Sequence, residues 1–416
     1  MVSNETTAFS FLIPRARVRP DKHSTKKGYD MRLHIDGTDA KARPHAHTYR
    51  GFNEAQGGWV IPRPANPHVH FRDPETQSDI FTLVVPETAK LYAWATAMPN
   101  LGKNRIRTPE QAIAYRNRIL ELGRTVNPTF EATVPLYLEP DIDHGVIRGG
   151  HESGAFWAAK LYPKNGTTES DHGIDFRDIR PILPTLKVME ELDMLCLVHA
   201  EVVLDQYDEL VVDRFREGLA IDVIDRILRH CPKLRVVFEH ISSRASIEAY
   251  WRWRRKGCHI EATIAPQYLL WNSSVLFERG MNPINFSIPI LKDEEDRVAL
   301  VEFMLEGGGM LGTDSAPHDL SAKSRHEHCP GGLFNEPVGL FIYFHLFRTL
   351  GGEQWFEQFV DFACRKAAHF YNVPESSEEV VIAEEAWQVP PRYTHGSAII
   401  IPMLADTVMP YSLKRA

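Results

Sequence analysis

The fold is decided by the stretch Leu195-Cys196-Leu197-Val198-His199 and by its counterpart further along the chain, Arg235-Val236-Val237-Phe238-Glu239-His240. Each is a short β-rich run that ends in a polar residue and is followed by an amphipathic, helix-like segment. The same alternation extends in both directions, from about Gly58 to Asp314. It predicts eight strands, at residues 59–64 running into 68–70, 92–98, 130–138, 156–162, 194–199, 235–240, 259–264 and 309–314.

Helical segments between these strands complete the pattern. One begins at Pro109 behind the cap-like Thr108, and others are expected at 179–192, 220–230, 243–256 and 294–306. Eight strand–helix units over about 260 residues predict an α/β fold, a closed (β/α)8 (TIM) barrel. An open, doubly wound sheet is the alternative, but the Gly-rich phosphate turn that normally follows its first strand is missing here.

Additions flank the predicted barrel. Residues 1–57 form an N-terminal extension with a basic excess and two strand-like pieces, 9–18 and 29–35; we expect it either to pair strands at the barrel edge or to be partly mobile. The barrel unit then takes residues 58–416. Its tail is expected to hold two helices and a closing strand, at 337–350, 354–370 and 398–403.

Composition argues against several classes of protein. The 416 residues carry 47 basic and 55 acidic side chains, a formal charge of −8 that disfavours nucleic-acid binding and a polybasic membrane anchor. Five scattered cysteines do not suit a disulfide framework, and no apolar run reaches the roughly 18 residues of a membrane helix. The polar start, MVSNETTAFS, lacks the apolar core of a signal peptide. We therefore expect a soluble, cytoplasmic protein, whose unusual feature is its 19 histidines.

Polar residues at the carboxyl ends of the predicted strands should converge on one mouth, where barrels of this kind hold their catalytic groups. His68 and His70 form the strongest pair, because residues i and i+2 of a strand face the same side and can reach one metal ion. Two other His-x-His triplets, at 45–47 and 326–328, have no predicted strand around them. Imidazole is the commonest metal ligand, and zinc suits it well. The candidate ligands are His68, His70, Lys160, His199, His240 and Asp314.

Two of these candidates have alternative roles. Lys160 follows Ala158-Ala159 on a buried strand, so it needs either an ion-pair partner, for which Asp314 is the candidate, or a chemical reason. Carbamylation is such a reason, because it turns the amine into a carboxylate that can bridge two cations. Asp314 can bind a metal and hold a proton during a reaction, or it can cap a following turn. The residues alone leave both choices open.

These motifs resemble those of the amidohydrolase superfamily, and within it the shorter bacterial-type dihydroorotases. The similarity runs in consistent order from about Asn66 to the end of the chain. The matching stretches are His68-Val69-His70-Phe71-Arg72-Asp73, Met98-Pro99-Asn100-Leu101, Lys160-Leu161-Tyr162-Pro163, Leu197-Val198-His199, Phe238-Glu239-His240, Ile288-Pro289-Ile290-Leu291 and Gly312-Thr313-Asp314-Ser315-Ala316-Pro317-His318.

The resemblance implies a binuclear zinc site and a substrate that carries a carboxylate. The implied metal ligands are His68, His70 and Asp314 for the more buried ion, His199 and His240 for the second, and carbamylated Lys160 as the bridge. The implied substrate contacts are Arg72, Asn100 and His318 on the carboxylate, Thr167 and Thr168 in a mobile loop over the ligand, and the backbone of Ile288 and Gly331 at the amide edge of the ring. The fork of an arginine matches a carboxylate, which suits the role of Arg72.

The implied reaction is reversible hydrolysis of L-dihydroorotate to N-carbamoyl-L-aspartate, a step of pyrimidine biosynthesis. Metal-activated water would attack the ring, with Asp314 as general base and then general acid. Two departures leave room for a related cyclic amide: Gln267-Tyr268-Leu269 stands where the family has Gln-His-Leu, and the loop 328–332 replaces a cysteine-rich one. A hydantoinase- or dihydropyrimidinase-like enzyme is therefore the first alternative, and a catalytically inactive scaffold the second. The resemblance also suggests a homodimer.

Overall fold

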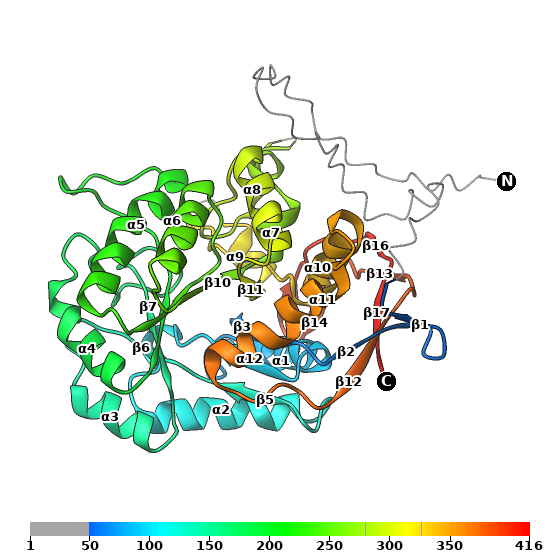
Figure 1. Ribbon diagram of the computed structural model, residues 1–416, viewed down its shortest axis with the longest axis horizontal. Coiled ribbons are helices and arrows are strands. Elements are labelled where there is room, and N and C mark those ends of the chain that lie inside the picture. Colours follow the sequence, from blue (N-terminus) through cyan, green and yellow to red (C-terminus); the bar gives the residue numbers. More distant parts are fainter. Residues whose placement is uncertain (1–49, 279, 326) are drawn as a thin grey trace.

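The computed structural model describes residues 50–416 apart from 279 and 326. In this part of the chain, parallel strands form a ring that helices surround (Figure 1). Strands 9–18 and 29–35 and the triplet at 45–47 were predicted in residues outside the described part. In ring order the strands are β3 (Ala65–Val69), β4 (Trp94–Ala97), β5 (Glu131–Thr133) continued by β6 (Leu136–Tyr137), β7 (Ala158–Leu161), β8 (Leu195–Val198), β9 (Arg235–Phe238), β10 (Ile260–Ile264) and β11 (Met310–Leu311).

Hydrogen bonds between the first and last strand positions close the ring. Val69 bridges Ser315 in parallel, and the His70 backbone N–H donates to the Ser315 carbonyl at 2.9 Å. The Asp314 N–H donates to the His68 carbonyl, also at 2.9 Å. Parallel pairing runs from β3 through to β11, with β5 and β6 as consecutive pieces of one strand position. The (β/α)8 barrel predicted from the sequence is confirmed.

The barrel strands are short and apolar because helices cover them outside and neighbouring side chains fill the inside. All four residues of β8 are fully buried. The first predicted helix, α2 (Pro109–Gly123), begins at a capping box. The Thr108 side chain accepts from the Gln111 N–H, and the Gln111 side chain accepts from the Thr108 N–H. Pro109 occupies the first turn.

The other predicted helices between the strands are present, with shifted ends. They are α4 (Leu183–Glu191), α5 (Asp213–His230), α6 (Arg244–Arg255) and α8 (Glu294–Leu305). Beyond β11, α10 (Glu336–Leu350) agrees with its prediction, whereas the predicted helix 354–370 is interrupted. It consists of α11 (Trp355–Val360), a π-helical turn at Asp361–Arg365 and α12 (Lys366–Tyr371). Among the described residues, no helix combines the length and the apolar character needed to cross a membrane.

Helix α1 (Ser78–Leu91) was not predicted. Pro86 stands inside it, which disfavours a helix on sequence grounds alone. Its buried face, which includes Phe81, Val85 and Ala89, packs into the main hydrophobic core and outweighs this local cost.

Two strand predictions were wrong in instructive ways. The run 59–70 does not form one strand: β2 (Gly58–Pro62) leaves the barrel and pairs antiparallel with β12 (Glu379–Ala383), while β3 alone enters the ring. The prolines at the junction lack the N–H groups that a continuous strand would need. The segment 398–403 does not close a sheet, because β15 (Ala398–Ile400) forms only a hairpin with β14 (Tyr393–His395).

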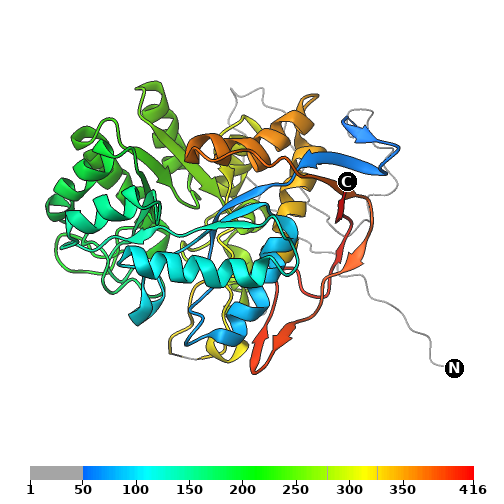
Figure 2. The ribbon, with the colours of Figure 1, turned by 90° about the horizontal axis from the view of Figure 1, so that it is seen from below.

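A second sheet therefore flanks the barrel, built from both ends of the described chain. Its order is β1 (Phe52–Asn53), β2, β12 and β17 (Ser412–Arg415). Figures 1 and 2 show these strands together at one side of the molecule, with the C-terminus beside them. The division into an extension, 1–57, and a barrel unit, 58–416, stays a prediction.

Candidate active site

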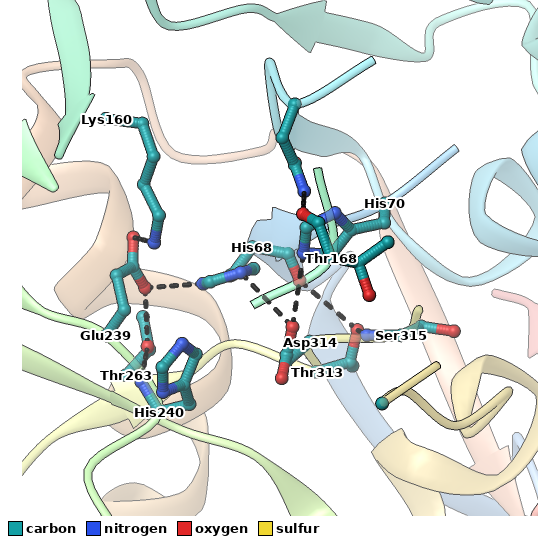
Figure 3. Close-up of polar contacts among 12 residues, drawn as sticks. His68, His70, Lys160, Thr168, Glu239, His240, Thr263, Thr313, Asp314 and Ser315 are labelled. Carbon is teal, nitrogen blue, oxygen red and sulfur yellow. Dashed lines mark hydrogen bonds and ion pairs between the residues drawn. The ribbon is translucent and has the colours of Figure 1, made fainter. Parts of the chain in front are cut away.

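The carboxyl ends of β3 and β11 bring three metal-binding side chains together. One ligand atom from each of His68, His70 and Asp314 lies within 4.8 Å of those of the other two. Asp314 Oδ1 is 3.3 Å from His68 Nε2 and 3.4 Å from His70 Nε2 (Figure 3). His68 is the last but one residue of β3 and His70 follows the strand, so the two rings face the same side as the sequence predicted. This donor set suits a divalent metal ion.

Several site residues lie where their strands end in the left-handed region of backbone space. Arg72, His240 and Asp314 have φ values of 70°, 41° and 48°. Such a conformation is costly for a residue with a side chain and persists only where the surroundings fix it. The His240 N–H is fixed by the Thr263 hydroxyl at 2.6 Å, and the Asp314 N–H by the His68 carbonyl.

Glu239, a residue that sequence reasoning did not single out, joins the cluster to Lys160. It is fully buried, and its Oε2 accepts from His68 Nδ1 and from the Thr263 hydroxyl, both at 2.6 Å (Figure 3). A proton on Nδ1 leaves the lone pair of His68 on Nε2, the atom that faces Asp314. The signal for Glu239 was present in the sequence, because a carboxylate at the end of a buried apolar strand needs a partner.

Lys160 is fully buried on β7, with Glu239 Oε1 3.8 Å from its Nζ. That distance allows an ion pair but is too long for a hydrogen bond, and among the described residues neither atom has a hydrogen-bond partner. The sequence-based alternative of an ion pair with Asp314 is therefore corrected, because the carboxylate in ion-pair contact with the amine is that of Glu239. Burial lowers the pKa of Lys160, although Glu239 and Asp314 oppose the shift.

His199 and His240 follow β8 and β9 and lie side by side, with ring centroids 4.6 Å apart. His199 Nε2 contacts Glu201 Oε2 at 2.8 Å, which places the proton on that nitrogen and leaves the lone pair of a neutral ring on Nδ1. His240 Nδ1 is buried and has no hydrogen-bond partner among the described residues. The His240 ring also lies near His68, at 5.3 Å between centroids, so the two histidine pairs adjoin.

Burial and charge set the protonation of the cluster. Burial lowers the pKa of His70 to about 4 and, together with His199, holds the pKa of His240 well below its ordinary value. Burial also opposes protonation of His68, but Glu239 and Asp314 outweigh it and raise the pKa of His68. Against the effect of burial, His68 holds the pKa of Asp314 well below the usual range. The cluster therefore offers ionised carboxylate and mostly neutral imidazole, which are the forms that bind metal.

A second group lines the same opening. The Arg72 guanidinium is buried; its Nε donates to the Pro317 carbonyl at 2.7 Å, and one terminal nitrogen is 2.9 Å from His318 Nε2. Burial and Arg72 hold the pKa of His318 well below 6.5, so the ring is neutral. The same Nε2 also lies 3.1 Å from the Gly331 carbonyl, so its tautomer decides whether it accepts from the guanidinium or donates to that carbonyl. Asn100 is held on both sides, since its Nδ2 donates to the Thr168 carbonyl at 2.9 Å and its Oδ1 accepts from a tyrosine hydroxyl, that of Tyr162, at 2.7 Å.

One cavity unites these groups. The side chains or backbone of every predicted site residue except His318 line it, and His318 contacts two of those lining residues, Arg72 and Gly331. Three further lining residues were not predicted: Tyr162, Ala316 and Gly332.

The structure also shows the surroundings of Asp314 and of Tyr268. Asp314 caps no helix, because the next one, α9 (Leu320–Lys323), begins behind Asp319, whose side chain accepts from the Ser321 N–H. Tyr268, the departure in the family pattern, is buried and does not line the cavity; its hydroxyl donates to the Pro289 carbonyl at 2.6 Å. Residue 326 of the third His-x-His triplet lies outside the described residues.

The chain is similar to known dihydroorotases. It is 36% identical over 357 residues to the dihydroorotase of Laribacter hongkongensis, covering 85% of this chain and 98% of that protein. It is 34% identical over 357 residues to the mitochondrial dihydroorotase of Oryza sativa, covering 84% and 83%. No protein-family model matches the chain.

Solved structures give the same picture of the fold. Dihydroorotase from Saccharomyces cerevisiae in complex with 5-fluoroorotic acid aligns with a TM-score of 0.77 at 23% identity, over 86% of this chain and 98% of that one. The enzyme from Campylobacter jejuni aligns with a TM-score of 0.75 at 27% identity, over the same shares. An L-hydantoinase from Arthrobacter aurescens shares the fold, with a TM-score of 0.68 at 16% identity over 86% and 85%.

A closed parallel barrel with a His/Asp cluster at the carboxyl ends of its strands defines an enzyme of the amidohydrolase type. The extent of the sequence similarity makes the assignment more specific. The chain belongs to the dihydroorotase family, whose members are metal-dependent cyclic amidohydrolases.

Proposed function

We propose that this chain catalyses the reversible hydrolysis of L-dihydroorotate to N-carbamoyl-L-aspartate. The observation that carries the proposal is the shared cavity, in which a buried arginine, Arg72, opens onto the same space as the His68/His70/Asp314 cluster. A substrate held there has a cation for its carboxylate and a metal-binding centre for its ring amide.

The donor set fits two zinc ions. His68, His70 and Asp314 would hold one, and His199 with His240 the second. Two buried nitrogens, His240 Nδ1 and Lys160 Nζ, have no hydrogen-bond partner in the described part of the chain; they suit this assignment, because such atoms are rarely left unpaired. Carbamylation of Lys160 would supply the anionic bridge between the ions. When bound, the metals supply Lewis acidity towards the ring carbonyl and lower the pKa of water to near neutrality.

The residues of this chain then perform the remaining tasks. Asp314 accepts a proton from the attacking water and gives it to the ring nitrogen as the carbon–nitrogen bond breaks and a carboxylate forms. Arg72, Asn100 and His318 orient the substrate carboxylate. Thr167 and Thr168, in the loop that Asn100 contacts, exclude water from above. The backbone at Ile288 and Gly331 meets the amide edge of the ring.

The test is turnover of L-dihydroorotate by the zinc-loaded protein, with hydantoin and dihydrouracil measured alongside. Arg72→Met should raise KM for dihydroorotate by about 10- to 100-fold, which corresponds to the free energy of one charged hydrogen bond. KM for hydantoin and dihydrouracil, which carry no carboxylate, should stay unchanged. Arg105→Met is the matched control, because Arg105 is also largely buried but pairs with Glu139 and does not line the cavity. Activity on the neutral rings alone would refute the substrate assignment and favour the hydantoinase-like alternative.

Asp314→Ala tests the proton-transfer role and the scaffold alternative together. The variant should lose most turnover while it still binds at least one zinc ion, as metal analysis would show. Near-normal turnover in this variant would remove Asp314 from the mechanism. Absence of turnover in the parent on all three rings would point to a different cyclic amide if the protein holds two metal ions, and to the inactive scaffold if protein purified without added zinc holds none. The homodimer and the cytoplasmic location are further proposals, for sedimentation analysis and cell fractionation to test.

A further inference from the structure

Lys323, the last residue of α9, is a buried lysine that ties two loops together through their carbonyl groups. Only 4% of its surface is exposed. Its Nζ donates to the carbonyls of Phe286 at 2.8 Å, Gly332 at 3.0 Å and Pro330 at 3.1 Å. An ammonium group has three N–H donors, so each has an acceptor. Within the described residues no carboxylate forms an ion pair with Lys323, and these bonds therefore stabilise its buried charge.

The two loops form one side of the active-site cavity. We call Ile288, Gly331 and Gly332 the ring wall, because they line the cavity and include the backbone expected to meet the substrate ring. The loops are in direct contact: the Gly332 N–H donates to the Phe286 carbonyl at 3.0 Å, and a Cβ at Gly331 would come within 2.4 Å of Ile288. A small shift of either loop therefore moves the ring wall.

Lys323 acts on this wall from behind. It does not line the active-site cavity but a neighbouring one, and Gly332 borders both. Burial lowers its pKa to about 8, so the amine carries its charge at neutral pH. Its hydrogen bonds go to backbone carbonyls rather than to side chains, so their geometry depends on the conformation of the loops.

We propose that Lys323 is a positioning residue that sets the ring wall for recognition of the cyclic amide edge of the substrate. The inference rests on the proposed function and deepens it. Because the wall contacts the ring equally in the ground state and in the transition state, its displacement weakens binding without slowing the chemical step. Loss of the ammonium group should therefore appear in KM rather than in kcat.

The experiment compares Lys323→Met with Lys366→Met in the zinc-loaded, full-length protein, using dihydroorotate. Lys366 is a matched control, because its Nζ also donates to two backbone carbonyls, those of Gly307 and Gly309, which do not line the cavity. We expect KM to rise about tenfold or more in Lys323→Met, with kcat within about threefold of the parent, and no change of KM in Lys366→Met.

Any other result refutes either the positioning role of Lys323 or the proposed function. An unchanged KM in a folded Lys323→Met protein, or equal losses of kcat in both variants, would refute the positioning role while the parent's turnover keeps the proposed function. A parent without dihydroorotate turnover would refute the proposed function and with it this inference. If circular dichroism shows that Lys323→Met does not fold, Lys323→Gln takes its place: its two N–H donors should limit the KM rise to about threefold, and no rise would refute the proposal.

Discussion

Replacing Glu239 by Gln should weaken zinc binding without changing the shape of the site. Gln keeps an acceptor for the Nδ1 proton of His68 but removes the negative charge. The contact thus changes from a charge-assisted hydrogen bond to a neutral one, a loss of about 1 kcal/mol, or roughly fivefold in affinity. The carboxylate also attracts the bound cation, so the full effect should reach the 10- to 100-fold (about 1.4 to 2.8 kcal/mol) typical of a partner that orients a metal ligand.

The assay is a competition titration of metal-free protein against a zinc chelator of known affinity. Glu191→Gln is the control, because Glu191 is exposed and pairs with Arg148 at the surface. Circular dichroism of both variants checks that the barrel is intact. A zinc affinity of folded Glu239→Gln within about twofold of the parent would refute the reasoning that Glu239 fixes the tautomer and basicity of His68.

Three further results are expected. Burial raises the pKa of Glu336 to about 7, so the native state keeps a proton that the unfolded chain releases between about pH 4.5 and 7. Raising the pH through this window should cost the parent about 3 kcal/mol of unfolding free energy that Glu336→Gln does not lose; equal pH slopes in urea unfolding would contradict this. Tyr162→Phe removes the donor to Asn100 and should raise KM for the carboxylate substrate by about three- to tenfold, measured against kcat; an unaltered KM would exclude the orienting role. Gly332→Ala should lower the free energy of unfolding by more than about 2 kcal/mol, measured by thermal or urea unfolding. The φ of Gly332 is +144°, and the new Cβ would lie 2.3 Å from the Ala316 carbonyl oxygen. A free energy of unfolding equal to that of the parent would show that the loop accommodates the Cβ without strain.

The sequence predicts the barrel well because its strands obey a simple rule. Each is a buried apolar run that ends in a polar residue, and β7, β8 and β9 lie inside the ranges expected for them. The prediction was wrong where long-range pairing decides. The run at 58–62 is as apolar as a barrel strand, and only its partner, β12, shows that it belongs to another sheet.

The candidate site shows the same division. Strand-end positions identified His68, His70, Lys160, His199, His240 and Asp314, and the family resemblance added the other predicted lining residues, whereas Tyr162, Ala316 and Gly332 were not predicted. Glu239 and Lys323 were missed because their roles depend on partners distant in sequence: His68 for the carboxylate, and the carbonyls of two loops for the amine. Such roles follow from three-dimensional contacts, which a single sequence does not display.

The pairing of β2 with β12 has a consequence for how the chain matures. Gly58 pairs with Ala383, so nearly the whole described chain must be synthesised before β2 finds its neighbour. The ring from β3 to β11 needs none of these residues and is complete in sequence earlier. During synthesis β2 therefore remains an apolar strand with one open edge, the kind of segment that attracts unwanted pairing. Its pairing with β12 is thus a late event in the synthesis of the chain, and the open edge of β2 stays uncovered until then.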